Sequence, residues 1–116
     1  MSDESIIAVI HVDVSVDADG NITCDPNPVP VNAANALIVF GLSTAGYAFP
    51  NTDAIVVDPP DPSFPFPSWT VQATQADLLD LCNEPGNVDY TVNLVETATG
   101  RTLSVDPVIQ NGDSLP

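Results

Sequence analysis

The chain has 116 residues, 44% of them hydrophobic, and its sixteen acidic residues face a single basic one, for a formal net charge of −15. This length predicts one domain, residues 1–116, and the apolar content excludes a disordered chain. The charge disfavours nucleic acids and membrane surfaces as partners and leaves cations or basic proteins. High solubility or a high-salt habitat is the plainer explanation, because acidity alone names no partner.

The first part of the chain alternates strand patterns with turn signals. Residues 6–16 alternate strictly between apolar and polar side chains, which predicts a half-buried strand. Residues 17–21 contain Asp-Gly and predict a hairpin turn into a strand at 22–24. Three prolines in residues 25–30 predict an extended edge or crossover segment. Residues 35–43 are apolar enough for a strand buried on both faces.

The middle of the chain is less regular. Residues 47–49 and 54–57 predict two short strands, and the proline-rich stretch 58–67 predicts a semi-rigid, polyproline-like segment. Residues 68–74 predict a strand with Trp69 and Val71 on one face. Residues 75–82 are the one helical candidate, of at most two turns, with the preceding Thr as its cap.

The strongest local signal is a β-hairpin over residues 88–109, with its turn at Gly100. If Glu96 pairs with Arg101, the register places Leu94 opposite Leu103, Val92 opposite Val105 and Tyr90 opposite Pro107, with the apolar residues on one face. About seven short strands with turns between them predict an all-β fold. We expect a single antiparallel β-sandwich, immunoglobulin-like or cupredoxin-like, with one short helix.

Metal sites and standard enzyme sites lack the residues they need. Copper and zinc centres need several His or Cys ligands, and the lone His11 falls on the polar face of the first strand, where we expect a surface residue. Asp17 and Asp19 resemble the start of a calcium loop, but the spacing is one residue short and the bidentate Glu is missing, so a plain turn explains them better. We therefore predict no metal, no cofactor and no standard enzyme class.

The N-terminus has no basic region before its apolar segment, so it fits neither a signal peptide nor a membrane span. We therefore expect a cytoplasmic protein. In that compartment Cys24 and Cys82 are expected to be two free, buried thiols.

The hairpin register also predicts a two-carboxylate site. Asp106 lies opposite Thr91 and diagonal to Asp89, which is within reach of side chains, so the two carboxylates can form a close pair. Asp106 precedes Pro107, and in an Asp-Pro bond the carboxyl can attack its own carbonyl carbon while the proline nitrogen leaves. The chain has three further Asp-Pro bonds, and such bonds mostly occur in turns or in edge strands, without a chemical role.

Several short motifs resemble the DP-EP family of small bacterial proteins. They are Leu37 to Thr44, Gly46 to Phe49, Trp69, Asn83-Glu84-Pro85, Tyr90 to Val92, and Thr99-Gly100 with Asp106 to Asn111. The resemblance implies a compact β-sandwich with an autocatalytic break at Asp106-Pro107, and its Glu-Pro motif adds Glu84 as a helper. Because the chain has no Lys, a Lys-Asp isopeptide cross-link is impossible.

Two functional hypotheses remain open from the sequence. The first is a binding or structural module that engages a protein partner, or associates with itself, through its proline-rich edge or an exposed strand. The second is a self-processing protein that cleaves Asp106-Pro107 by an aspartic-type mechanism, with Asp89, Thr91 and Glu84 as helpers.

Overall fold

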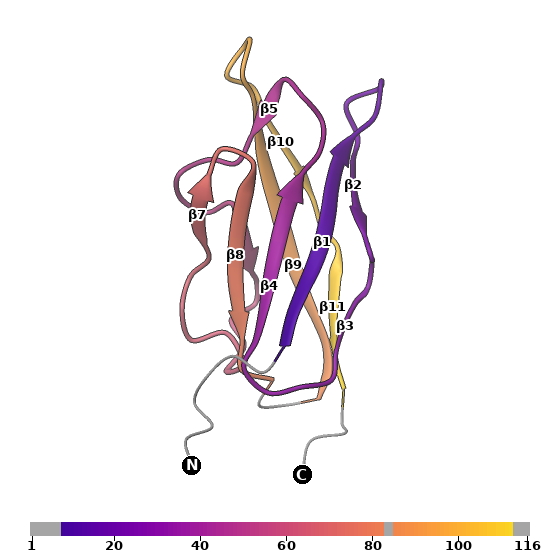
Figure 1. Cartoon of the computed structure of the whole chain (residues 1–116), viewed down its shortest axis with the longest axis vertical. Helices are drawn as coiled ribbons and strands as arrows, with labels where there is room; N and C mark the ends of the chain where they lie inside the picture. Colours follow the sequence, from indigo (N-terminus) through magenta and orange to yellow (C-terminus); the bar gives the residue numbers. More distant parts are fainter. Residues whose placement is uncertain (1–7, 83–84, 113–116) are drawn as a thin grey trace.

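A computed structural model of the chain describes residues 8–82 and 85–112, and every regular element in these two ranges is a β-strand (Figure 1). These described residues include no helix long and apolar enough to cross a membrane. The strands are β1 (Ala8–Val16), β2 (Ile22–Asp25), β3 (Val29–Val31), β4 (Ala36–Leu42), β5 (Tyr47–Ala48), β6 (Ile55–Val57), β7 (Trp69–Gln72), β8 (Gln75–Asp80), β9 (Gly86–Glu96), β10 (Thr102–Val105) and β11 (Val108–Asn111).

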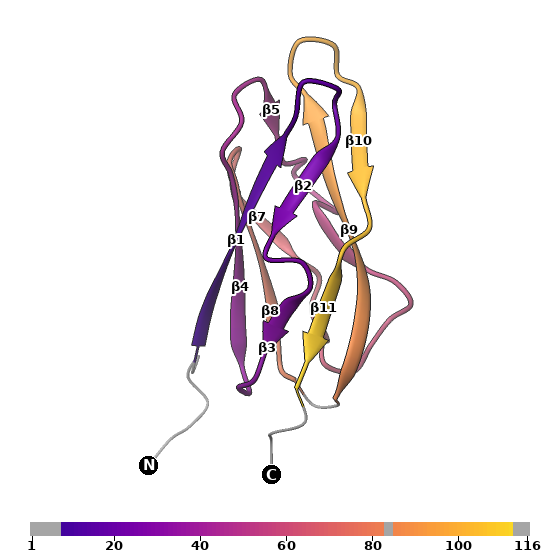
Figure 2. The same cartoon turned by 90° about the vertical axis from the view of Figure 1, so that its right-hand side faces the viewer.

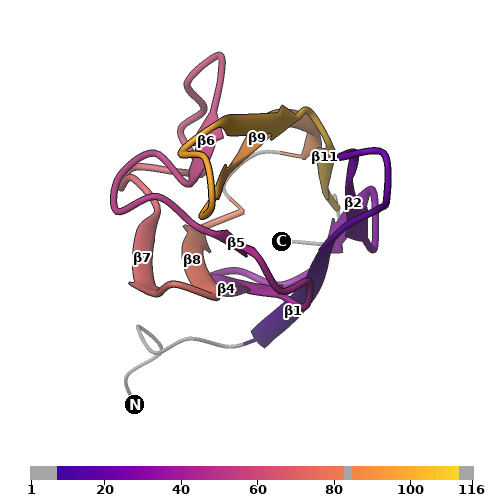
Figure 3. The ribbon, with the colours of Figure 1, turned by 90° about the horizontal axis from the view of Figure 1, so that it is seen from above.

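The strands form two mixed sheets that do not close into a barrel (Figure 3). The first sheet has the order β2-β1-β4-β8-β7, and the second has the order β10-β9-β11-β3, with β5 and β6 also paired to β9. The expectation of a purely antiparallel arrangement is wrong, because β1 pairs with β4 in parallel and β11 pairs with β3 in parallel. Pro26 and Pro28 lie between β2 and β3 and interrupt strand pairing there, because proline has no backbone N–H to donate. The chain then passes into β3 of the second sheet before it returns to the first sheet as β4.

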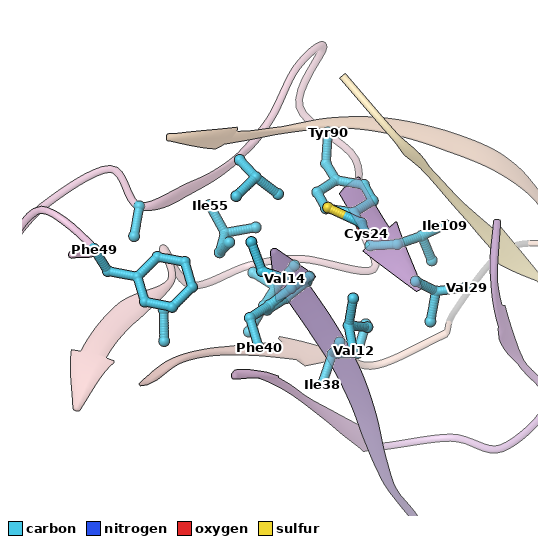
Figure 4. Packing of buried hydrophobic residues seen from close by; sticks show 14 of the residues in the cluster. Val12, Val14, Cys24, Val29, Ile38, Phe40, Phe49, Ile55, Tyr90 and Ile109 are labelled. Carbon is cyan, nitrogen blue, oxygen red and sulfur yellow. The ribbon is translucent and has the colours of Figure 1, made fainter. Parts of the chain in front are cut away.

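The two sheets enclose one hydrophobic core, built from alternate residues of each strand (Figure 4). Val12 and Val14 of β1 and Ile38 and Phe40 of β4 enter it from the first sheet, with at most 1% of each side chain exposed. Tyr90 enters from the second sheet, and its ring centroid lies 5.7 Å from that of Phe40. The strands expected over 6–16 (from Ala8 on), 22–24 and 35–43 are therefore confirmed within a residue or two.

The predicted helix over 75–82 is wrong, because residues Gln75–Asp80 form β8 between β4 and β7. Leu78 pairs with Ile38 and Leu79 with Leu37, so this segment is central in the first sheet. A helix of two turns is marginal by itself, and pairing on both sides buries more apolar surface than a helix there could. The structure has eleven strands in its described ranges rather than about seven, because short segments such as β5 and β6 pair separately with β9.

Both cysteines are buried and free, as predicted. The Asp-Gly turn between β1 and β2 is also confirmed. The Asp17 carboxylate accepts hydrogen bonds at 2.9 Å from the backbone N–H groups of Asp19 and Asn21, and the Asn21 bond leads the causes that lower the pKa of Asp17. Asp17 therefore stabilises its own turn, which accounts for this residue as part of a plain turn.

Candidate functional site

The predicted hairpin register is confirmed and extends beyond the hairpin. Leu94 pairs with Leu103 and Val92 with Val105 in β9 and β10. The same register continues into β11, where Val108 pairs with Asp89 (Figure 2). The strand that runs beside β9 is therefore interrupted only at residues 106 and 107, the predicted Asp-Pro bond.

Asp106 and Pro107 are held differently at this interruption. Pro107 is buried, and its carbonyl oxygen accepts a hydrogen bond from the Tyr90 backbone N–H at 3.2 Å. The Asp106 side chain is exposed, and its Oδ1 accepts a hydrogen bond from Thr91 Oγ1 at 2.7 Å. The structure thus brings Thr91 to Asp106 across the strands, as the register predicts.

An open groove of about 410 Å³ surrounds this hydrogen bond and is lined by Asp58, Asp89, Tyr90, Thr91 and Asp106. Asp89 and Asp106 line the same groove, and the close contact between their carboxyl groups stays a prediction. Glu84 lies outside the described residues. The sequence reasoning missed Asp58, which enters the groove because β6 pairs with β9 and the Asp58 backbone N–H donates to Asp89 O at 3.3 Å.

Chemically, this acidic groove offers three carboxylates and one hydroxyl, with no basic side chain in its lining. The one basic side chain of the sequence, Arg101, lies at the β9–β10 turn with its Nε 3.6 Å from Glu96 Oε1. No three His, Cys, Asp or Glu side chains in residues 8–82 and 85–112 are grouped so that they could hold a metal ion. The groove can therefore orient the Asp106 carboxylate and supply nearby carboxyl groups for proton transfer.

A second candidate site is the outer face of the first sheet, the face that points away from the core. On β1, β4 and β8 the register aligns Val9, Leu37 and Leu79 in one row across this face. The next row contains His11, Val39, Asp77 and Trp69, with Val71 following Trp69 on β7. We refer to these side chains together as the outer face.

Most side chains of the outer face are apolar, and several of them are exposed to solvent. Val9 is 52% exposed, Trp69 43% and Val71 51%, while Leu37 and Leu79 are half-buried. Apolar side chains thus gather on two neighbouring rows of this face, with His11 and Asp77 between them, and exposed apolar groups that cluster on a folded surface are typical of sites of interaction with another molecule. His11 is exposed on this face, as expected.

The outer face becomes acidic toward one corner. Asp13 of β1 pairs with Asp25 of β2, and both carboxylates are exposed. Like charges on directly opposite residues repel, so this corner favours a positively charged neighbour. The sequence signal for the outer face was present in the apolar run at residues 37–40, which indicated burial on both sides of that strand.

No family model matches the chain, and none of the curated proteins is similar to it.

Proposed function

We propose that this protein is a binding module that docks another protein onto the outer face of its first sheet. The observation that carries the proposal is the row of Val9, Leu37 and Leu79 across three strands. The exposed Trp69 of β7 lies in the next row, and the exposed Val71 lies at the register shift that follows it. Such residues lose apolar exposure when a partner covers them, and burial of aromatic side chains dominates the energy of many interfaces.

The partner expected on this face carries apolar side chains bordered by Lys or Arg. A net charge of −15 makes two copies of this chain repel each other, and the Asp13 and Asp25 carboxylates add to that repulsion at the corner of the face. The same charges attract a basic protein and raise its association rate. We therefore assign the face to a different, basic partner rather than to a second copy.

Display of genomic fragments from the source organism tests this proposal. Fragments are selected with the wild-type protein and counter-selected with the double variant Trp69→Lys, Val71→Lys, which changes exposed positions only. We expect the recovered fragments to be basic, to bind the wild type, and to bind the double variant at least about tenfold more weakly by calorimetry, because truncating central aromatic contacts has effects of this size.

Asp106→Asn, in the acidic groove, is the matched control and should leave this affinity unchanged. Fragments that bind the double variant as tightly as the wild type would contradict the proposal. So would a wild-type homodimer, detected by light scattering, that becomes monomeric in the double variant, because the face would then belong to a second copy.

The second candidate function is self-cleavage at Asp106-Pro107, and the hydrogen bond from Thr91 to Asp106 in the acidic groove favours it. Asp106 Oδ2 attacks the Asp106 carbonyl carbon, the bond from that carbon to Pro107 N breaks, and a cyclic anhydride forms. Pro107 N takes a proton from solvent, relayed by a neighbouring carboxyl group such as that of Asp89, and water then opens the anhydride to leave Asp106 as a C-terminal residue.

Mass spectrometry under denaturing conditions tests this second candidate. Denaturation is needed because β11 pairs with both β9 and β3, which would keep a severed C-terminal fragment attached. After incubation between mildly acidic and neutral pH, a fragment ending at Asp106 is expected, absent in Asp106→Ala and retained in Asp61→Ala, a control at another Asp-Pro bond. A single species of full mass after long incubation would remove this candidate.

We also propose that the protein is a β-sandwich of immunoglobulin-like or cupredoxin-like type, that it is related to the DP-EP proteins, and that it is cytoplasmic. Two sheets around one core support the sandwich. Two buried free thiols support a reducing compartment.

A further inference from the structure

A pocket of about 190 Å³ lies between β6 and the proline-rich loop that joins it to β7, and it shares no lining residue with the acidic groove, which Asp58 borders directly after β6. The loop projects from the body of the protein before it returns to β7 (Figure 3). The floor of the pocket includes the buried side chains of Ile55 and Leu78, and Phe64 and Phe66 of the loop form part of its wall. Phe66 is 58% exposed, which is unusual for so large an apolar side chain.

Two carboxylates complete the lining. Asp53 and Asp61 both line the pocket, and no basic side chain does. Asp61 is held by its own turn, since its Oδ1 accepts a hydrogen bond from the Ser63 backbone N–H at 2.9 Å. Asp53 is exposed at the loop before β6, where its backbone φ is 59° and its carbonyl accepts a hydrogen bond from Asn93 Nδ2 at 2.8 Å.

The pocket therefore combines an apolar floor, aromatic walls and an acidic lining. A long side chain with a cationic end suits this combination, because its methylene groups cover apolar surface while its charge meets carboxylates. Aromatic rings also attract a cation that lies over their faces. An anionic ligand would meet two like charges in the pocket and the field of a protein with net charge −15.

We propose that this pocket binds the cationic side chain of a lysine or arginine from another protein. The chain has no lysine and one arginine, which is engaged near Glu96, so the cation must come from outside. The pocket is a different site from the outer face described above. Its test uses a free amino-acid derivative, so either proposal can be contradicted without the other.

Amide NMR titration with acetyl-lysine methylamide and acetyl-arginine methylamide tests the pocket. We expect saturable shifts confined to the amides of residues 53–57, 61, 63, 64, 66, 68 and 78, because the prolines of the loop have no N–H, with a Kd on the order of 10 mM for one isolated side chain. Acetyl-norleucine methylamide has the same apolar stem without the charge and should bind at least about fivefold more weakly, because it cannot pair with the carboxylates. Shifts of equal size and affinity with the norleucine derivative would overturn the cationic specificity.

The double variant Asp53→Asn, Asp61→Asn removes both charges and keeps the folded pocket. An Asn at 61 retains the oxygen that accepts from Ser63, and Asn tolerates the positive φ at 53. Binding of the lysine derivative should become undetectable in this variant, and Phe66→Leu should weaken it about two- to fivefold.

The control is Asp17→Asn, Asp19→Asn, which removes the same number of charges at the β1–β2 turn, where an Asn at 17 retains the oxygen that accepts from the backbone N–H groups of residues 19 and 21. This control should bind the lysine derivative as the wild type does. Equal loss of binding in the two double variants would show a general charge effect and would overturn the proposal, as would the absence of saturable shifts in the wild type.

Discussion

Asp80 and Asn111 meet across the two sheets as a buried carboxyl–amide pair in which each residue keeps one oxygen without a hydrogen-bond partner. Asn111 Nδ2 lies 3.4 Å from Asp80 Oδ1, which also accepts a hydrogen bond from the Cys82 backbone N–H at 2.7 Å. Among the described residues, Asp80 Oδ2 and Asn111 Oδ1 have no partner. Both of these unpaired atoms are acceptors, so a proton on Asp80 Oδ2 would turn one of them into a hydrogen-bond donor.

The pair predicts a loss of stability as the pH rises. Burial, with a further contribution from the charge of Asp61, raises the pKa of Asp80 from 3.8 to about 6. Between these values the folded protein holds a proton that the unfolded chain has released. The stabilisation is therefore present at low pH and is lost as the pH rises through 6, by about 3 kcal/mol in total.

Urea unfolding of the wild type and Asp80→Asn from pH 4.5 to 8 measures this loss. The comparison is needed because the other acidic residues also change the absolute curve. We expect Asp80→Asn to gain about 2 kcal/mol relative to the wild type over this range, the part of the total loss that falls above pH 4.5, since its amide is neutral at every pH and can donate a hydrogen bond. Parallel curves for the two proteins would show that Asp80 is ionised throughout and would contradict the prediction.

The contrast between the C-terminal hairpin and β8 explains how far the sequence predicts this fold. The hairpin register follows from local alternation around one turn, so Leu94 and Leu103 could be paired without a structure. Residues 75–80 carry an ambiguous pattern, and their strand conformation comes from pairing with β4, which is more than thirty residues away in sequence. Local propensity alone cannot report such a neighbour.

The candidate sites divide in the same way. Thr91 and Asp106 were predictable because both belong to the hairpin, whereas Asp58 joins their groove only through the distant pairing of β6 with β9. The outer face was harder still, because the apolar side chains at Leu37 and Val39 point away from the core while Ile38 and Phe40 point into it. A sequence does not say which of two apolar faces is left open.

Tyr90→Phe is expected to stabilise the protein. The Tyr90 side chain is 1% exposed, and its hydroxyl has no hydrogen-bond partner among the described residues, so the folded state bears the cost of removing that hydroxyl from water. Removing it while keeping the ring beside Phe40 should raise the free energy of unfolding by about 1 kcal/mol. Urea unfolding measures this change, and Tyr90→Ala, which should cost about 3–5 kcal/mol, verifies that the ring is packed. A loss of stability in Tyr90→Phe would indicate a hydrogen bond to the hydroxyl.

Two glycine substitutions are expected to have opposite signs. A Cβ at Gly41 in β4 would have no atom within 4 Å, so Gly41→Ala restricts only the unfolded chain and should stabilise by about 0.5–1 kcal/mol. Gly100 at the β9–β10 turn has a φ of +77°, which is unfavourable for an alanine, so Gly100→Ala should cost about 1–2 kcal/mol. Thermal unfolding of both variants checks the pair. The same sign for both would contradict the register of the hairpin turn or the open surface at Gly41.

Cys24 is expected to react slowly with alkylating reagents in the folded protein. Burial, with a smaller contribution from the charge of Asp13, raises the pKa of its thiol from 9.0 to about 11. Because only the thiolate reacts, iodoacetamide at pH 8 should modify Cys24 about 100-fold more slowly in buffer than in urea, measured by mass spectrometry in a Cys82→Ala background. Adding Asp13→Asn should increase the folded-state rate, because it removes the charge that opposes ionisation. Equal rates in buffer and in urea would contradict the burial of this thiol in the core.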